Sequence, residues 1–128
     1  MKTILIADDD YANRILPGLL LDKQKYQLFE TDNGQSVLEI LEVNSIDYLL
    51  LDISLPNISG IDICKQIKSN PAHRQTTVIA YTAHSMEREI EKILAAGFDA
   101  VLIKPITKEQ LLKALKTKKD SGNNYQHR

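Results

Sequence analysis

The sequence predicts one α/β domain in which a parallel β-sheet carries helices on both of its faces. Short apolar runs alternate five times along the chain with segments whose apolar residues have helical spacing. The connecting segments are short, which favours parallel strands joined by right-handed crossover helices. A length of 128 residues suits a single domain, and 43% hydrophobic residues are enough for one core.

Five apolar runs are short enough to be strands that are buried in the sheet. The clearest run leads into Asp52, and the loop that follows it contains Pro56 and Gly60. A carboxylate at the C-terminal end of a buried strand stands where open α/β sheets bind their ligands. The predicted strands cover residues 3–7, 26–31, 48–52, 77–82 and 100–104.

Five segments have the apolar spacing of a helix that is buried on one side. Pro17 and Gly18 lie inside the first of them. Proline removes a backbone donor and glycine adds flexibility, so we expect a kink or a late start there. The predicted helices cover residues 12–23, 35–43, 60–69 and 87–96, and a last one begins at Thr107. The residues expected to cap or stop them are Asp32-Asn33-Gly34, Asn44-Ser45, Asn70-Pro71, Gly97 and the capping-box pattern Thr107-Lys108-Glu109-Gln110.

Composition and charge argue against several classes of partner. The 16 basic and 17 acidic side chains give a formal net charge of −1, so nothing favours a nucleic acid. No apolar run approaches the roughly 20 residues of a membrane span, and the N-terminal run is too short for a signal peptide. The single Cys64 excludes an internal disulfide and fits a reducing cytoplasm. We expect residues 1–116 to form the domain and the polar residues 117–128 to fray into solvent.

Polar side chains follow four of the five predicted strands. Asp8 and Asp9 come after the first strand, and Asp52, Thr82 and Lys104 end the third, fourth and fifth. A single aspartate at such a position is more often a helix cap or a turn residue. Parallel strands, however, all end at the same edge of the sheet, so these side chains should converge, and their joint occurrence favours a functional site.

The chemistry of this set points to phosphoryl transfer. Neighbouring carboxylates raise one another's pKa, and a divalent cation relieves the repulsion; an all-oxygen set suits Mg²⁺. Lys104 adds one positive charge to the edge and Thr82 adds one hydroxyl donor. A metal, a lysine and a hydroxyl that converge on a carboxylate neutralise phosphoryl oxygens and hold the acceptor in line. The carboxylate itself can be the nucleophile and form an aspartyl phosphate.

These residues and their neighbours resemble the receiver domain of two-component response regulators. The similarity covers Lys2 to Lys116. It implies a flavodoxin-like sheet in the order 2-1-3-4-5, the order of the chemotaxis receiver. The matching pieces are Ile6-Ala7-Asp8-Asp9-Asp10, Leu51-Asp52, Leu55-Pro56, Gly60, Thr82-Ala83, Ala96-Gly97 and Lys104-Pro105.

The resemblance implies a role for each matching side chain. Asp52 would accept a phosphoryl group from a sensor histidine kinase or a histidine phosphotransfer protein. Thr82 would move toward that group, and Lys104 would pair with it.

The resemblance also implies a metal site for Mg²⁺. Asp9 would bind the ion directly, Asp8 mostly through water, and the backbone carbonyl of Ser54 would be a further ligand beside Asp52. The adjacent Asp10 is given no such role, and we interpret it as the cap of the first helix.

The sequence departs from the family pattern at the position three residues before Lys104. The family usually has Tyr or Phe there, which turns inward as the threonine moves, and this chain has Val101. Valine cannot make that swing, which puts in question the coupling to the face made by the last helix, the last strand and the preceding helix. Ser54 and His84 occupy two variable positions that, in this family, tune how fast phosphate is lost; His84 is either a pH-sensitive or catalytic group or, in the simpler interpretation, a side chain at the rim. Side chains interpreted as core packing are Cys64, Tyr81 and Phe98.

Three functions remain after this comparison. The first is a phosphorylation-controlled switch and binding module, whose chemistry is stoichiometric and not that of an enzyme acting on a foreign substrate. The added group carries about −1.5 to −2 charges and would shift an equilibrium between two conformations. The second is an aspartyl-phosphate phosphatase, which usually has a second aspartate two residues after the nucleophile, where this chain has Ser54. The third is a degenerate receiver that serves only as a scaffold, which the intact acid set opposes and Val101 leaves open.

One experiment distinguishes two of these alternatives. Chelation of Mg²⁺ separates the first function from the third, because only a working receiver loses phosphorylation by a small phosphodonor.

No effector segment follows the fifth strand–helix unit. The chain is then either a stand-alone receiver whose output is a protein–protein contact, or a part of a longer regulator or hybrid kinase.

Overall fold

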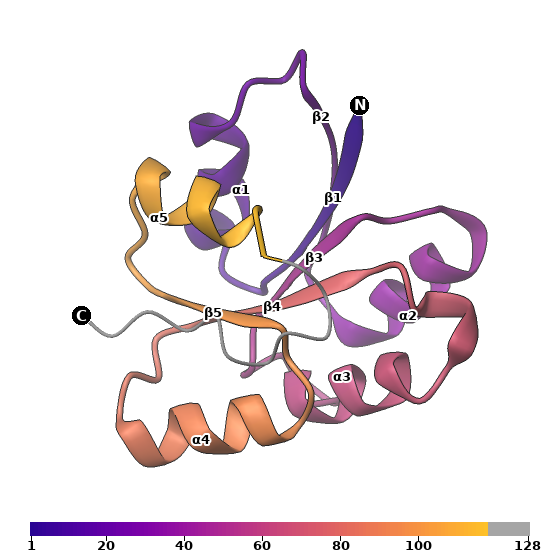
Figure 1. Ribbon diagram of the computed structural model, residues 1–128, viewed down its shortest axis with the longest axis vertical. Coiled ribbons are helices and arrows are strands. Elements are labelled where there is room, and N and C mark those ends of the chain that lie inside the picture. Colours follow the sequence, from indigo (N-terminus) through magenta and orange to yellow (C-terminus); the bar gives the residue numbers. More distant parts are fainter. Residues whose placement is uncertain (118–128) are drawn as a thin grey trace.

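A parallel sheet of five strands forms the centre of the protein, in the order β2-β1-β3-β4-β5 (Figure 1). The structure is a computed structural model that describes residues 1–117. Each neighbouring pair of strands is parallel, so both the parallel sheet and the strand order implied by the resemblance are confirmed. The strands are β1 (Lys2–Ala7), β2 (Tyr26–Thr31), β3 (Tyr48–Leu51), β4 (Thr77–Thr82) and β5 (Ala100–Ile103).

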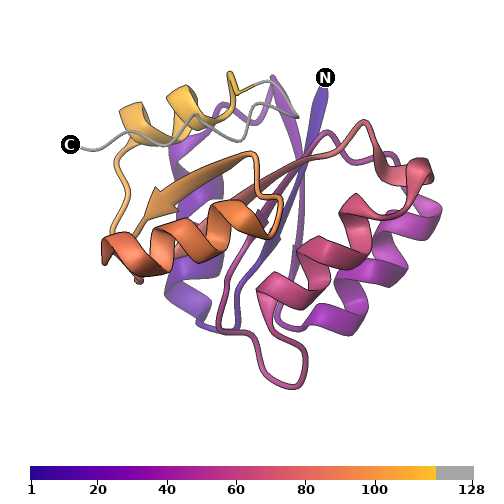
Figure 2. The same ribbon diagram turned by 60° about the horizontal axis from the view of Figure 1, so that its bottom comes forward.

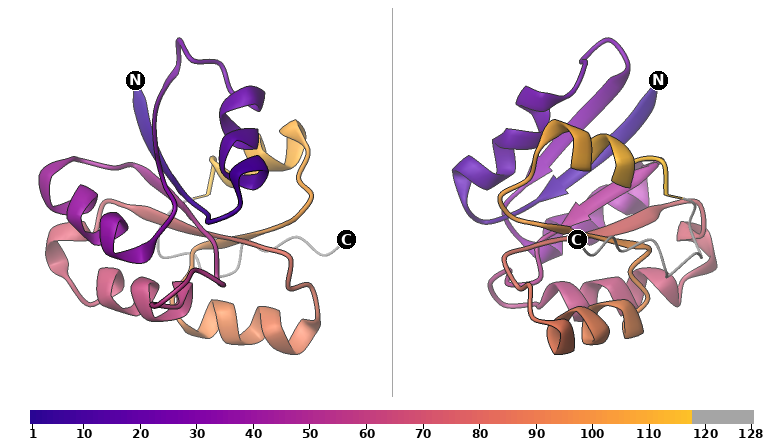
Figure 3. Two further views of the ribbon diagram at one scale, coloured as in Figure 1. Left: turned by 180° about the vertical axis from the view of Figure 1, so that it is seen from behind. Right: turned by 60° about the vertical axis from the view of Figure 1, so that its left-hand side comes forward.

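Helices cover both faces of this sheet, as the sequence predicts. One face carries α1 and α5, which lie side by side in both views of Figure 3. The other face carries α2, α3 and α4, below the sheet in Figure 1 and in front of it in Figure 2. The helices are α1 (Tyr11–Leu20), α2 (Gly34–Val43), α3 (Gly60–Lys68), α4 (Glu87–Ala95) and α5 (Lys108–Ala114).

Side-chain caps fix where most of these helices begin. The Asp10 carboxylate accepts a hydrogen bond from the Asn13 backbone N–H at 2.9 Å, which confirms its interpretation as the cap of α1. Thr107 and Gln110 form the predicted capping box at α5. Gly97 follows α4 with φ of 109°, a left-handed conformation that glycine adopts without a steric penalty.

The expectation of a late start at Pro17 is wrong. Helix α1 begins at Tyr11 and passes through Pro17, which is buried inside it. Pro17 has no N–H, so the carbonyl of Asn13, four residues earlier, lacks its intrahelical donor. The Tyr81 hydroxyl donates a hydrogen bond to this carbonyl at 2.9 Å and takes the place of the missing amide. A side chain from another part of the chain therefore satisfies the group that proline leaves open.

Three boundaries also differ from the prediction. Helix α1 ends at Leu20 and not at residue 23, because Leu21 already has extended backbone angles. A short 3₁₀ helix, η1 (Pro71–His73), occupies part of the predicted polar loop, and the Asn70 side chain caps it. Asp52 and Lys104 each lie one residue after a strand and not within it. The expected tail, residues 117–128, lies outside the described residues except for Thr117.

Two hydrophobic clusters form the core, one on each face of the sheet. Cys64 and Phe98 are fully buried in the cluster beneath α2, α3 and α4, and Tyr81 is fully buried in the other. Their interpretation as packing residues is confirmed. Burial raises the pKa of the Cys64 thiol to about 12, so this cysteine stays protonated at neutral pH. Within residues 1–117, every helix is too short or too polar to cross a bilayer.

Candidate functional site

The pairing of β1 with β3 brings two of the predicted acids together. Ala7 lies opposite Leu51 in this parallel ladder, and the Asp52 N–H donates to the Ala7 carbonyl at 2.9 Å. Asp8 and Asp52 are therefore neighbours at the C-terminal edge of the sheet, and both are buried, at 0% and 6% exposure. Asp9 is exposed and completes the cluster: the three residues offer carboxylate oxygens within 4.8 Å of one another.

Lys104 reaches this cluster from the far strand of the sheet. Its backbone N–H donates to the Thr82 carbonyl at 2.8 Å, which extends the β4–β5 ladder beyond the end of β5. Its Nζ lies 2.6 Å from Asp8 Oδ2 and 3.7 Å from Asp52 Oδ1. One ammonium thus contacts two buried carboxylates, and the side chains from three of the four strands predicted to converge lie together.

The cluster fits a hard divalent cation. Three carboxylates face one lysine, so negative charge is in excess at a largely buried position. Asp8 Oδ2 is buried, and no hydrogen bond of standard geometry reaches it from the residues that the structure describes; its short contact with Lys104 is an ion pair. An oxygen-only donor set with more negative than positive charge suits Mg²⁺ or a similar ion.

The environment of Asp52 makes its charged form costly. Burial, the main cause, raises the pKa of this carboxyl, and the Asp8 and Asp9 charges raise it further. The Ser54 N–H, which donates to Asp52 Oδ1 at 3.1 Å, and Lys104 both act to lower the same pKa. As a result, any additional cation in the cluster would stabilise the charged form of Asp52.

Gly60 lets the loop after β3 fold back against Asp52. Its N–H donates to the Ile53 carbonyl at 2.9 Å. A Cβ at this position would overlap the Asp52 carbonyl oxygen and would lie 2.8 Å from the Ile53 Cα. Both neighbours are backbone atoms, so a side chain at residue 60 would displace the segment that carries the site carboxylate.

Thr82, at the end of β4, is fully buried. Its hydroxyl accepts a hydrogen bond from the His84 N–H at 3.0 Å. The His84 ring lies 3.2 Å from the Ser54 hydroxyl through Nε2, and 2.9 Å from a Glu89 carboxylate oxygen through Nδ1. The contact with His84 is the main cause that lowers the pKa of Glu89.

The partner of His84 was missed in the sequence. Glu89 stands in the first turn of α4, and only its place five residues after His84 could have suggested the contact. The structure brings Ser54 and His84 together at the edge of the sheet, as expected for two positions beside Asp52. Whether they set the lifetime of a phosphoryl group stays a prediction.

A family model for the response regulator receiver domain matches residues 4–116. The chain belongs to this family. The polar-differentiation response regulator DivK of Brucella anthropi is 31% identical over 91% of this chain and 94% of its own length. The signal transduction histidine-protein kinase BarA of Shigella flexneri is 39% identical over 85% of the chain, which spans 12% of that kinase.

A solved structure shows the same likeness. It is the receiver domain of a sensor histidine kinase from Pseudomonas aeruginosa, with a magnesium ion coordinated in its active site cleft. The similarity has a TM-score of 0.80 at 25% identity and covers 90% of this chain and 94% of that one. The chain is thus a receiver domain of two-component systems with the flavodoxin-like fold.

Val101 occupies the family's usual aromatic position in this receiver domain. It is 8% exposed and belongs to the hydrophobic cluster that also contains Ile90, Ile93 and Phe98. The side chain fills the core beneath α4 and has no polar tip to rearrange. Its effect on the output face stays a prediction.

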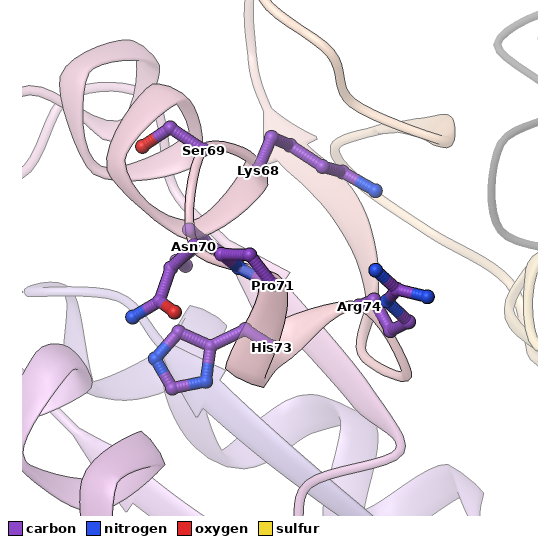
Figure 4. Close-up of a pocket in the computed structure, with 7 residues that line it drawn as sticks. Lys68, Ser69, Asn70, Pro71, His73 and Arg74 are labelled. Carbon is purple, nitrogen blue, oxygen red and sulfur yellow. The ribbon is translucent and has the colours of Figure 1, made fainter.

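A shallow pocket lies at the opposite edge of the receiver domain, where α3 leads through η1 into β4 (Figure 4). Its volume is about 200 Å³. Lys68 and Arg74 extend to one side, whereas Asn70 and His73 lie together on the other (Figure 4). The pocket contains none of the residues predicted from the strand ends. Its lining residues are Ile67, Lys68, Ser69, Asn70, Pro71, His73 and Arg74.

Proposed function

We propose that this receiver domain accepts a phosphoryl group on Asp52 and thereby switches protein–protein contacts. The donor is a phosphohistidine of a sensor histidine kinase or a histidine phosphotransfer protein. An Asp52 oxygen attacks the phosphorus, the new P–O bond forms as the P–N bond breaks, and the imidazole leaves. The observation that carries this proposal is the convergence of Lys104 Nζ on Asp8 and Asp52 within a three-carboxylate cluster.

Asp8 and Asp9, with Asp52 and the Ser54 carbonyl, are the residues that would hold Mg²⁺. The ion supplies positive charge that offsets the repulsion between the incoming phosphoryl oxygens and the carboxylates. The excess of three carboxylates over one ammonium supports this assignment. The magnesium in the active site cleft of the Pseudomonas aeruginosa receiver supports it as well.

Lys104 and Thr82 respond to the new group. Lys104 turns its ammonium from Asp8 to a phosphoryl oxygen, a short movement because the ammonium already lies 3.7 Å from Asp52 Oδ1. Thr82 offers its hydroxyl hydrogen to another phosphoryl oxygen, since its oxygen accepts from His84 and its hydrogen is available to an acceptor. These movements shift the domain between two conformations.

The domain, which comprises residues 1–116, catalyses its own phosphorylation in the cytoplasm. It does not turn over a foreign substrate. The output is a contact with another protein, and neither nucleic acid nor membrane is a partner. A phosphatase that works through an aspartyl phosphate usually has a second aspartate two residues after the nucleophile, and Ser54 stands there.

Phosphorylation by acetyl phosphate tests this proposal. Intact-mass measurement should show about one added phosphoryl group in the wild type with Mg²⁺ and none after chelation. Asp52→Ala should take up none. Asp62→Ala, which removes an exposed aspartate from the first turn of α3, should react like the wild type. Equal uptake by Asp52→Ala and wild type would refute Asp52 as the acceptor.

A further inference from the structure

We propose that Tyr81 is a positioning residue that holds the Lys104 ammonium at the carboxylate cluster and ties it to helix α1. The inference rests on the proposed function, because it concerns the lysine that would pair with the phosphoryl group. It goes beyond the interpretation of Tyr81 as a packing residue. Two contacts of Tyr81, one with α1 and one with Lys104, carry it together with the burial of the ring.

The first contact fixes the hydroxyl end of Tyr81. Its O–H donates to the Asn13 carbonyl at 2.9 Å, across 68 positions in sequence. This carbonyl lacks a helical donor because Pro17 has no N–H. Because Pro17 leaves the Asn13 carbonyl without its helical donor, the tether depends on the pair formed by Pro17 and Tyr81.

The second contact lies on the ring. Lys104 Nζ is 4.8 Å from the centre of the Tyr81 ring, within the range of a cation–π interaction. The Lys104 side chain is 12% exposed and Tyr81 is 0% exposed, so little water competes for this face. The ammonium therefore has an aromatic face among its contacts in addition to Asp8 and Asp52.

The geometry explains why a ring is needed there. A lysine side chain has four flexible bonds, and two carboxylates at 2.6 and 3.7 Å do not fix its direction of approach. The ring, held by its hydroxyl to α1, restricts one side of the space open to the ammonium. This contact does not involve a carboxylate, so it does not depend on the ion pair between Lys104 and Asp8.

The aromatic ring that contacts Lys104 therefore lies on the α1 side of the sheet. Tyr81 belongs to the hydrophobic cluster beneath α1 and α5, whereas Val101 belongs to the cluster beneath α4. Tyr81 therefore contacts both Lys104 and Asn13 in α1.

Three variants test the inference: Tyr81→Leu removes the ring, Tyr81→Phe keeps it without the hydroxyl, and Phe98→Leu removes a ring of the other cluster as a matched control. The first readout is the NMR shift of the Lys104 ε-methylene protons in metal-free protein. An aromatic face shifts such protons upfield. We expect that shift to be lost in Tyr81→Leu, largely kept in Tyr81→Phe and unchanged in Phe98→Leu.

The second readout is the rate of phosphorylation by acetyl phosphate with Mg²⁺. Tyr81→Leu should react about fivefold more slowly, Tyr81→Phe should recover most of that loss, and Phe98→Leu should match the wild type. A wild type that takes up no phosphoryl group would refute the proposed function, while the NMR shift would still decide the Lys104 contact. A normal shift and a normal rate in Tyr81→Leu, or equal slowing in Phe98→Leu, would refute the role of Tyr81 alone.

Discussion

The hydrogen bond between Tyr81 and α1 makes a quantitative prediction about stability. In the double variant Tyr81→Phe with Pro17→Ala, the alanine supplies the N–H that the Asn13 carbonyl lacks in the wild type. The two substitutions should therefore compensate one another. A double-mutant cycle built from the wild type, both single variants and the double variant measures this coupling directly.

The magnitude follows from the geometry of the bond. Tyr81→Phe removes a hydrogen bond of 2.9 Å and leaves the Asn13 carbonyl, inside a helix and partly buried, without its donor. A group left unsatisfied in this way costs about 1–3 kcal/mol, and partial access to water places the expected loss near 1 kcal/mol. In the Pro17→Ala background the alanine N–H donates to the Asn13 carbonyl. Tyr81→Phe should then cost only roughly a few tenths of a kcal/mol.

Urea unfolding of the four proteins is the assay, since a change in midpoint at constant slope reports stability alone. We expect a coupling free energy of about 1 kcal/mol, with the double variant more stable than the sum of the two single effects predicts. A control cycle pairs Pro17→Ala with Phe98→Leu, whose ring lies in the other cluster and should add independently. Additivity within about 0.5 kcal/mol in the Tyr81 cycle would refute the reasoning.

Three further predictions concern the site and its support. The raised pKa of Asp52 means that the folded protein holds this proton to higher pH than the unfolded chain, so stability falls as pH rises between the two pKa values. Asp52→Asn should remove this fall and be more stable than metal-free wild type at pH 7, and equal stability at pH 7 would contradict it. Gly60→Ala should cost about 1–3 kcal/mol in urea and slow phosphorylation, because its Cβ meets the backbone of Asp52; a fully active, equally stable variant would disprove the close approach. Lys68→Met removes the cation that lies 2.7 Å from buried Asp99 and should cost about 3 kcal/mol, whereas a loss of only a few tenths would show that this pair contributes little.

Most of the fold could be predicted from local patterns. The alternation of apolar runs and helical spacing located the five strands and five α-helices that lie within residues 1–117, since each pattern reports burial over a few consecutive residues. The caps at Asp10 and Thr107 were also predictable, because the donors and acceptors lie within three residues of one another. The parallel arrangement then placed Asp8, Asp52 and Lys104 at one edge.

What the sequence did not predict depends on contacts between distant residues. The expectation that Pro17 delays the start of the helix failed, and the Asn13 carbonyl that proline leaves open accepts from a hydroxyl 68 positions away. The contact of Glu89 with His84 was missed because it joins a loop residue to the first turn of the next helix. Neither the helical nor the strand periodicity of side chains applies across such a boundary. The distances from Lys104 to its partners likewise follow from side-chain directions that spacing does not encode.

The location of the phosphoryl group is the most direct test of the central claim that the carboxylate cluster serves Asp52. After reaction with acetyl phosphate and Mg²⁺, peptide mapping by mass spectrometry should find the group on Asp52 and on no other residue of the edge. Its appearance on Asp8 or Asp9, or on the hydroxyl of Ser54 or the ring of His84, would contradict the account.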